Sequence, residues 1–507
     1  MDQPKRKEFH SGSIRLRSAL KSRVSAAESS PLVLDLDGTL LKTDLLVEGI
    51  IALVRRNIMM LLPVLLWLMQ GRAVLKRKIA ERQGLDIATL PFNREIVAFA
   101  EAEKAKGRLI VLATAADELL ARRIAQHLAF VDRVIASDGR TNLKGDAKAA
   151  RLAELYPEGF TYAGDSAADL PVWREAAHIV LVGVSSTVRR QAEKIGRPIT
   201  VFERNSAIRA MIKGLRLHQW TKNLLIFLPL VLGGKAQQSE AWLAAGAAFL
   251  TLGLIASATY LVNDLWDLPH DRGHWSKRNR PLASGDLSIP AALAVIVLSL
   301  FAGFTLAANL GLPALLAVST YTAVTLAYSL SLKRVPILDA ATLGGLFTLR
   351  LVLGIAAVGV AWSPWLLTFS MFLFTSLSFA KRQVEMRGAV RAGKAGRIAG
   401  RGYESADEPI VTTFGIAAGV ASVVIFILYL SNEAFRNASL AAPLLLWVFP
   451  PVLMLWIGRI WILAGRDALN DDPIAFAVKD GPSLLMGTVS GLAFLLAATG
   501  LPAGLLT

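Results

Sequence analysis

The distribution of apolar positions divides this chain into two halves. Up to about residue 215, short apolar runs alternate with longer polar stretches, whereas from about residue 223 onward the apolar residues form segments of roughly 18–22 residues. Segments of that length match the hydrocarbon core of a bilayer, so we expect the second half to be an all-α polytopic membrane bundle. About nine transmembrane spans are expected, at 223–236, 241–262, 289–309, 312–331, 337–358, 362–380, 411–430, 440–463 and 482–503.

The first half has the pattern of a parallel α/β domain. Apolar runs that end in polar residues occur in "PLVLDLDGTLLKTD", "GRLIVLATAADE" and "FTYAGDSAADLPVWREA". Because helical stretches separate these runs, they predict parallel strands whose polar residues meet at one edge of a sheet. The expected organisation is a basic flexible tail at 1–30, an α/β domain at 31–205 with a helical cap at about 41–105, a linker with an amphipathic entry at 206–222, and the membrane bundle at 223–507.

One apolar segment of the expected cap stands apart. The stretch "IMMLLPVLLWLMQG" at 58–71 is too short for a comfortable span and is interrupted by Pro63. It is either a buried cap helix or a segment that dips into the membrane interface, and flanking cations favour interface contact because they suit anionic headgroups. These cations are Arg55, Arg56, Arg72, Lys76 and Lys78.

Composition and charge support a membrane protein. The chain is 54% hydrophobic and carries a net charge of +16, and its mean hydropathy is +0.48. Its lack of cysteine excludes disulfides, thiolate metal sites and cysteine nucleophiles. No base-reading motif accompanies the positive charge, so we expect no nucleic-acid partner. Instead, Lys and Arg gather in alternate loops, which predicts that these loops and the N-terminal half lie on the cytoplasmic side of the cytoplasmic (inner) membrane. The loops are 263–288, 332–336, 381–410 and 464–481.

The first of these loops begins with an acidic motif, "YLVNDLWDLPHDRGHWSKRNRPLASG" at 260–285. Asp264, Asp267 and Asp271 are spaced i, i+3 and i+7, so a continuing helix would stack them on one face, where they would repel unless a cation lay among them. Carboxylates suit Mg2+, which takes further ligands from substrate phosphates. Pro269 is expected to interrupt the helix, so that Asp271 enters from a loop. The alternative is a solvated basic loop with incidental acids. Candidate phosphate-binding neighbours are Asn263, Lys277, Arg278 and Arg280.

A second polar cluster follows in "AYSLSLKRVPILDAATLGGLFTLRLVLG". It places Tyr328, Lys333, Arg334 and Asp339 at a short turn between spans. Arg350 follows about three helical turns later, inside a span. An intramembrane arginine is costly, so Arg350 is either a functional residue or the partner of a carboxylate on another helix.

These two clusters in a nine-span bundle resemble the UbiA superfamily of intramembrane prenyltransferases, over about residues 210–507. In that family the first motif binds Mg2+ and a diphosphate, in a cavity open to the cytoplasm and the lipid. Aromatic prenyltransferases usually carry a second Asp in the second motif, where this chain has Leu343. The stretches "LRLHQWTKNLLIFLPLVLGG", "YSLSLKR" and "KRQVEMRG" are more similar to the branch typified by decaprenyl-phosphate phosphoribosyltransferase.

That branch transfers 5-phosphoribose from phosphoribosyl diphosphate to a polyprenyl phosphate. Binding the phosphate groups of its substrates requires several basic side chains. This chain supplies Lys222, Lys333, Arg334, Arg350, Lys381 and Arg382.

In the first half, Asp35, Thr114, Lys144 and Asp165 occur in the order of the four motifs of the haloacid dehalogenase-like phosphatases, over about residues 31–200. The resemblance implies that Asp35 attacks phosphorus, Asp37 acts as general acid and base, and Thr114 and Lys144 hold the phosphoryl oxygens. The candidate Mg2+ ligands of this domain are Asp35, Asp37, Asp165 and Asp169.

The sequence therefore favours a bifunctional enzyme with one Mg2+ in each domain, which makes a polyprenyl-phosphate phosphoribose and then removes its 5-phosphate. The main alternative is transfer of a prenyl chain from a prenyl diphosphate to an aromatic acceptor, with the first half acting as a regulatory, docking or scaffold module. The prenyl chain length, the natural phosphatase substrate and formation of a homo-oligomer are left open.

Overall fold

The computed structural model describes residues 30–500, except 83, 139–140, 275, 392, 394–395, 397, 399, 437–439 and 470–472. The expected basic tail therefore lies outside the described residues, apart from Ser30. The chain forms two compact units, each described here by itself. The first contains residues up to Leu215 together with Asp264–Val295, and the second contains Arg216–Asn263 and the residues from Ile296 onward.

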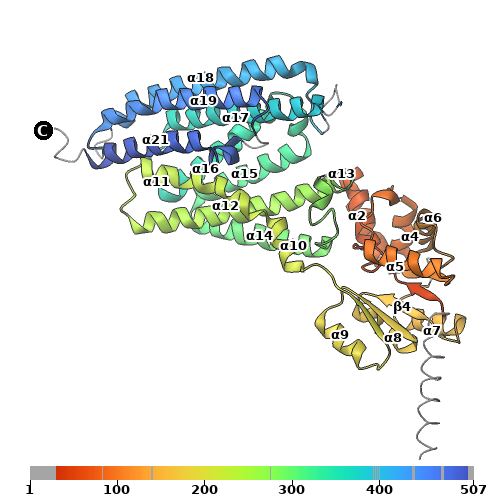
Figure 1. Cartoon of the computed structure of the whole chain (residues 1–507). Coiled ribbons are helices and arrows are strands. Elements are labelled where there is room, and N and C mark those ends of the chain that lie inside the picture. The colour runs from red at the N-terminus through yellow and green to blue at the C-terminus, as the bar shows by residue number, and fades with distance from the viewer. Residues whose placement is uncertain are drawn as a thin grey trace, which may run out of the picture. The chain divides into compact units, whose positions relative to one another are not determined.

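The first unit is built on a parallel sheet, as the sequence predicts (Figure 1), and this sheet has six strands in the order β3-β2-β1-β4-β5-β6. Its strands are β1 (Leu32–Leu34), β2 (Ile110–Asp117), β3 (Arg133–Ser137), β4 (Thr161–Gly164), β5 (His178–Val182) and β6 (Ile199–Phe202). Its helices are α2 (Leu45–Arg56), α3 (Leu61–Met69), α4 (Arg72–Arg82), α5 (Arg94–Ala105), α6 (Glu118–Leu128), α7 (Asp146–Leu155), α8 (Leu170–Glu175), α9 (Ser186–Glu193), α10 (Ala207–Leu215) and α13 (Leu268–Gly273).

The strand register brings the expected polar residues to one edge. Leu34, the last residue of β1, pairs with Leu112 of β2 and with Ala163 of β4. Asp35 directly follows β1, while Thr114 and Asp165 each lie two residues beyond a partner of Leu34. The carboxyl ends of the three central strands therefore present these residues side by side, where open α/β sheets place their ligands.

Apolar cores cover both faces of this sheet. Successive strand residues point to opposite faces, and Leu34 accordingly packs with Ile96 of α5 and Ile124 of α6. Val33 packs in a second core with Leu152 of α7 and Trp173 of α8. Helices on both faces explain why the central strands are apolar throughout, rather than alternating.

The cap between β1 and β2 consists of α2, α3 and α4, together with a short 3-10 turn at Ile58–Met60. Val64 of α3 is buried against Leu53, Leu75 and Ile79 of the neighbouring cap helices. The other face of α3 is open, with Leu62 66% exposed. The segment 58–71 is therefore a cap helix with only one of its faces packed.

The second unit is the membrane half. Among the described residues, seven helices are long and apolar enough to cross a membrane, and they coincide with seven of the nine expected spans. They include α12 (Ser239–Trp266), α14 (Ile289–Asn309), α15 (Leu312–Leu330), α16 (Leu338–Val358), α18 (Glu408–Asn432), α19 (Phe449–Gly465) and α21 (Gly481–Thr499). The helices from α15 to α19 pack successively against one another (Figure 1).

Two expected spans are not among these seven. The segment 223–236 forms a 3-10 stretch, η4 (Leu217–Phe227), followed by the five-residue helix α11 (Leu228–Leu232). The segment 362–380 lies within the 28-residue helix α17 (Pro364–Arg391), whose C-terminal part is the polar stretch "KRQVEMRGAVR". A short helix, α20 (Pro473–Ala477), precedes α21.

The acidic motif lies where α12 gives way to α13. Helix α12 ends at Trp266, and Pro269 occupies the first turn of α13, where the missing N–H of proline costs no hydrogen bond. The expected interruption of the helix near Pro269 is therefore confirmed. Asp271, however, lies on the short helix α13 rather than in a loop, because the chain resumes helical geometry immediately.

Candidate functional site

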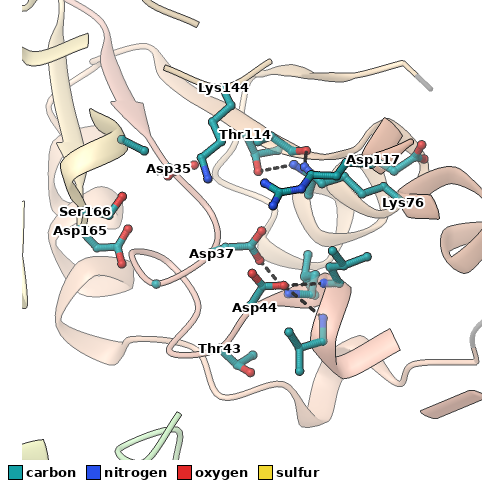
Figure 2. Close-up of a pocket in the computed structure, with 18 of the residues that line it drawn as sticks. Asp35, Asp37, Thr43, Asp44, Lys76, Thr114, Asp117, Lys144, Asp165 and Ser166 are labelled. Carbon is teal, nitrogen blue, oxygen red and sulfur yellow. Dashed lines mark hydrogen bonds between the residues drawn. The ribbon is translucent and has the colours of Figure 1, made fainter. Parts of the chain in front are cut away.

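Three carboxylates converge at the carboxyl edge of the sheet. Asp35, Asp165 and Asp169 each place an oxygen within 4.8 Å of the others, and Asp35 and Asp165 face the same cavity in Figure 2. The turn after β1 passes so close to Asp165 that a Cβ at position 38 would lie 2.0 Å from its Oδ2, and Gly38 also has φ +79°. Only glycine fits this turn, since it alone lacks the Cβ and tolerates that φ.

A buried lysine balances these carboxylates. Lys148 of α7 lies with its Nζ 3.0 Å from Asp35 Oδ1 and 2.8 Å from the hydroxyl of Tyr162, and 3.9 Å from Asp169 Oδ1. Only 3% of its side chain is exposed. Lys144, the sequence candidate, is exposed, lines the same cavity and extends toward Asp35 (Figure 2).

Lys148 was missed by the sequence analysis, although "LKGDAK" contains a signal. Lys144 precedes the Gly145 cap of α7 and Lys148 lies in the first turn of that helix, so the two lysines flank a helix start that lines the cavity.

Asp169 shapes the turn after β4. Its Oδ1 accepts a hydrogen bond from the Tyr162 hydroxyl at 2.8 Å, and its Oδ2 accepts the N–H groups of Asp165 and Ser166, each at 3.1 Å. Since these bonds occupy both oxygens, Asp169 holds the turn that presents Asp165, while Asp35 and Asp165 remain the more accessible oxygen donors.

Asp37 is not in this group of three. Its Oδ1 accepts the N–H of Leu45 at 2.9 Å. Burial, together with the nearby charge of Asp44, raises the pKa of Asp37 to about 8. Burial and the neighbouring Asp35 raise the pKa of Asp165 to about 7. A protonated Asp37 at neutral pH has the property that a general acid needs.

Other walls of the cavity, whose volume is about 610 Å³, come from β2, the cap and the segment 288–290. Thr114 is fully buried and its Oγ1 accepts the N–H of Ala116 at 3.0 Å. Lys76 of α4 donates to the carbonyl oxygen of Ala115 at 2.5 Å and to Asn142 Oδ1 at 3.0 Å. The expectation that Lys76 contacts headgroups is therefore wrong, because the face of α4 that carries it turns toward the catalytic edge.

The donor set suits a divalent cation. Three carboxylates this close repel one another, and burial raises the pKa of Asp35 as well as that of Asp165. Hard oxygen ligands of this kind are those that Mg2+ prefers. A cation held by Asp35 and Asp165 would remove the repulsion that Lys148 only partly offsets.

A second acidic centre lies at the junction of α12 and α13. Arg280 Nη1 donates to Asp264 Oδ1 at 3.1 Å and to Asp271 Oδ2 at 2.6 Å, and both aspartates are buried. Asp267 lies between them at the start of α13. Lys277 and Arg278 are exposed on a short 3-10 turn. The structure thus brings together Asp264, Asp271 and Arg280.

In the second unit, Arg350 is buried on α16 among neutral partners. Its guanidinium donates to Asn223 Oδ1 at 3.1 Å and to the Tyr321 hydroxyl at 3.3 Å, and lies 4.9 Å from the ring centroid of Phe347. Lys222 approaches the same ring at 5.9 Å. The expected alternative, a carboxylate on another helix, is not among these partners of Arg350.

A further group of polar residues in this unit gathers around Asp339, which is completely buried. Its Oδ2 accepts from Arg382 Nε and its Oδ1 from the Tyr403 hydroxyl, each at 2.6 Å. The hydroxyl of Tyr328 accepts from both Arg382 and Arg401. Glu385 of α17, which pairs with Arg382, and Arg401 and Tyr403, which follow α17, were not found from the sequence, because no periodic pattern marks them in this basic stretch. Lys333 and Arg334 lie on a 3-10 turn, and Lys381 and Asn263 lie on α17 and α12.

Substitutions of the two lysines near Asp35, Lys148 and Lys144, should differ in their effect on folding stability. Replacing Lys148 with Gln leaves buried carboxylates unbalanced and is expected to cost about 3–5 kcal/mol of folding free energy, with loss of phosphomonoester hydrolysis. The matched change Lys144→Gln should weaken substrate binding but leave stability unchanged, because this side chain is exposed. Chemical denaturation and steady-state kinetics of the two full-length variants measure both effects. Equal stability of the variants would contradict the assigned role of Lys148.

Asp37 should make stability depend on pH. The pKa of Asp37 is about 8 in the folded state, compared with the ordinary value of 3.8. Between about pH 4 and pH 8, Asp37 therefore keeps its proton only in the folded state. Because the unfolded state loses this proton, the stability of the fold falls as the pH rises through this window. Because Asn does not titrate, Asp37→Asn should be more stable than the wild type near pH 8, by about 1.4 kcal/mol per pKa unit at most. This advantage should shrink toward pH 5.

The measurement is the thermal unfolding of the full-length protein in the presence of a chelator. Hydrogen exchange of peptides from β1 and β4 monitors the unfolding of this domain. An advantage that stays constant from pH 5 to pH 8 would show that Asp37 has an ordinary pKa.

Comparison with known proteins agrees with the two-part organisation. The model of the UbiA prenyltransferase family matches residues 224–478, and that of the haloacid dehalogenase-like hydrolases matches residues 32–174. The chain is 40% identical to uncharacterized protein y4nM of Sinorhizobium fredii, over 92% of this chain and 91% of that protein.

Two further relatives match about half of this chain and bear more specific names. Nodulation protein NoeC of Azorhizobium caulinodans is 34% identical over 55% of this chain and 91% of that protein. Decaprenyl-phosphate phosphoribosyltransferase of Corynebacterium glutamicum is 33% identical over 44% of this chain and 69% of that protein. With the matched region covering half of its length, this chain belongs to the UbiA prenyltransferase family and carries a haloacid dehalogenase-like hydrolase domain ahead of its membrane helices.

Proposed function

We propose that this protein carries out two consecutive reactions on a membrane lipid. The UbiA region transfers 5-phosphoribose from phosphoribosyl diphosphate to a polyprenyl phosphate. The hydrolase domain then removes the 5-phosphate and leaves a polyprenyl-phosphate ribose. Both sites lie on the cytoplasmic side of the inner membrane, in accord with the lysines and arginines of the alternate loops.

The transferase assignment rests on the side chains of the second polar cluster, around Asp339. Asp339 is completely buried and accepts from Arg382 and Tyr403, and position 343 is leucine. Aromatic prenyltransferases, by the resemblance described above, use a pair of aspartates there. The aspartate of this cluster is therefore enclosed by a cation and a hydroxyl, and the cluster does not offer a second set of free carboxylates for Mg2+. The relative named decaprenyl-phosphate phosphoribosyltransferase supports the same choice.

The transfer requires no strong base. The bond from ribose C1 to the diphosphate breaks, and a new bond forms between C1 and an oxygen of the lipid phosphate, which is already an anion. Charge grows on the leaving diphosphate, and cations stabilise it. Asp264, Asp267 and Asp271 would hold Mg2+, which neutralises that charge. Arg280, which already contacts two of these aspartates, is placed to bind the same diphosphate.

A surface groove in the second unit supports a lipid substrate. It has a volume of about 670 Å³ and is lined by apolar residues of α15, α16 and α17, including Leu338, Leu349 and Met371. One lining residue, Leu332, directly precedes Lys333. A prenyl chain in this groove would place its phosphate beside the second polar cluster.

The hydrolase site has the groups that phosphomonoester hydrolysis needs. A carboxylate oxygen of Asp35 attacks phosphorus, and the bond from phosphorus to ribose O5 breaks. Asp37, protonated at neutral pH, donates its proton to the departing O5. Asp37 then accepts a proton from the water that attacks the aspartyl-phosphate, which releases inorganic phosphate and restores Asp35. Lys144 and Thr114 face the phosphoryl group, while Lys148 positions Asp35.

The open face of α3 would bring this domain to the lipid surface. Besides Leu62, the side chains of Leu65, Leu66 and Met69 are about half exposed or more, while Leu68 of the same helix lines the catalytic cavity. Arg56 and Arg72, which flank the segment, are exposed and suit anionic headgroups. A lipid-linked phosphate could then enter the cavity without leaving the membrane surface.

Product analysis of two matched variants tests the serial scheme. Asp35→Asn removes the nucleophile but preserves shape, so this variant should accumulate lipid-linked phosphoribose that the wild type converts to lipid-linked ribose. Asp264→Asn should form neither product, yet still hydrolyse lipid-linked phosphoribose supplied from outside. Mass spectrometry of lipids, after addition of phosphoribosyl diphosphate and a polyprenyl phosphate with Mg2+, measures both.

The other outcomes discriminate between the functions. Identical products from the wild type and Asp35→Asn would make the hydrolase domain a scaffold or assign it another substrate. Transfer of a prenyl chain from a prenyl diphosphate to an aromatic acceptor, without use of phosphoribosyl diphosphate, would establish the main alternative instead.

Because the chain has no cysteine, contact of α3 with lipid can be tested with single labels. A polarity-sensitive fluorophore on Leu62→Cys should emit at shorter wavelength in nanodiscs and be quenched by spin-labelled lipids. The control is Leu119→Cys on α6, also an exposed leucine, at 38%, which should respond to neither. Equal quenching at the two positions would refute the contact.

A further inference from the structure

A buried ion pair joins the cap to the segment that carries the acidic motif. Arg272 of α13 donates through Nη1 to Glu48 Oε2 at 3.1 Å and through Nη2 to Glu48 Oε1 at 2.5 Å. The two side chains are only 5% and 3% exposed. Thr43 adds a hydrogen bond to Glu48 at 2.7 Å. Planar two-point pairing of this kind fixes orientation as well as charge.

The same segment is fastened at a second place. Lys42, at the end of the catalytic turn, pairs with Asp286 at 3.2 Å. Arg204 donates to the carbonyl oxygens of Gly285 at 2.8 Å and Lys42 at 3.2 Å. At position 285 a Cβ would lie 2.6 Å from the Cβ of Lys42. Gly285 and Asp286 thus lie against the chain that leads from Asp37 into α2.

The fastened segment reaches the catalytic cavity. Ser288, Ile289 and Pro290 line it together with Asp35, Lys148 and the other catalytic residues. Further apolar lining comes from the cap, through Leu46 and Ile50 of α2 and Leu68 of α3. The cavity therefore combines a polar end at the carboxyl edge of the sheet with apolar walls. That combination fits a phosphate monoester carried on an amphiphilic molecule rather than a small, fully polar one.

We propose that residues 283–290 form a substrate-binding wall of the hydrolase site, which the Glu48–Arg272 pair holds in place and which favours lipid-linked phosphate monoesters. This inference rests on the proposed hydrolase function. Arg272 directly follows Asp271, so the short helix α13 carries a residue of the acidic motif and the fastening residue of the hydrolase wall. The same stretch of chain serves both reactions.

The pair acts as a positioning device, because neither residue lines the cavity. Removing one partner leaves a buried charge unpaired, which displaces the segment rather than altering the catalytic groups. Loss of the ion pair should therefore change which substrates the site prefers. A small soluble ester reaches Asp35 without the wall, whereas an amphiphilic ester loses its apolar contacts.

The test compares two substrates in the full-length protein. Glu48→Gln and Arg272→Gln should each raise KM for lipid-linked phosphoribose, prepared with the Asp35→Asn variant, at least about tenfold. The value of kcat/KM for p-nitrophenyl phosphate should change less than threefold. Arg189→Gln is the matched control, since it breaks an exposed pair with Glu203 in the same domain and should change neither constant. An equal fall for both substrates, or no change for either, would overturn the proposal.

Hydrogen exchange tests the wall without any substrate. In Arg272→Gln, exchange should rise together in peptides covering 42–50 and 283–290, and it should stay unchanged in β1 and β4. If the wild type fails to hydrolyse lipid-linked phosphoribose, the proposed function is wrong, but this readout still decides whether the pair fastens the wall. Unchanged exchange in the two peptides would refute the fastening.

Discussion

Buried carboxylates need positive charge beside them, and this requirement organises three acidic centres among the described residues. At the edge of the sheet, Lys148 is paired with Asp35 and approaches Asp169. At the acidic motif, Arg280 bridges Asp264 and Asp271. In the membrane half, Arg382 and Tyr403 enclose Asp339. Each cation offsets the cost of removing its carboxylates from water, so the helices and turns that supply both must keep their positions.

The three centres differ in what remains available for chemistry. Asp339 is sealed and serves mainly to join α16 to α17. Asp35 and Asp165 instead open into a cavity of about 610 Å³, and Arg280 retains 28% of its side-chain exposure. At these two centres, unlike at Asp339, a metal ion could bind to the carboxylates that face the cavity and a phosphate group to the partly exposed Arg280. The Glu48–Arg272 pair is a fourth case, in which two buried charges fasten chain segments more than two hundred residues apart.

Much of the catalytic edge could be predicted because its signals are local. Apolar runs ending in Asp35, Thr114 and Asp165 indicate neighbouring parallel strands, and the end of α12 near Pro269 follows from the chemistry of proline. Lys76 was misjudged because a basic helix with little apolar pattern does not reveal which face turns inward. Tyr403 and the Glu48–Arg272 pair were beyond reach, since each depends on contacts between segments distant in sequence. For the same reason, the packing of residues 264–295 with the N-terminal unit could not be read from hydropathy, which assigns them to a loop and to the start of a span of the membrane bundle.

The central claim is that one chain adds phosphoribose to a lipid and then removes its phosphate. Phosphoribosyl diphosphate labelled with 14C in the ribose and with 32P at the 5-phosphate tests this claim in a single reaction of the purified wild-type protein with a polyprenyl phosphate. Our account predicts lipid that carries 14C without 32P, with release of labelled inorganic phosphate in equal amount. Lipid that keeps both labels in their original ratio, or that carries neither, would contradict it.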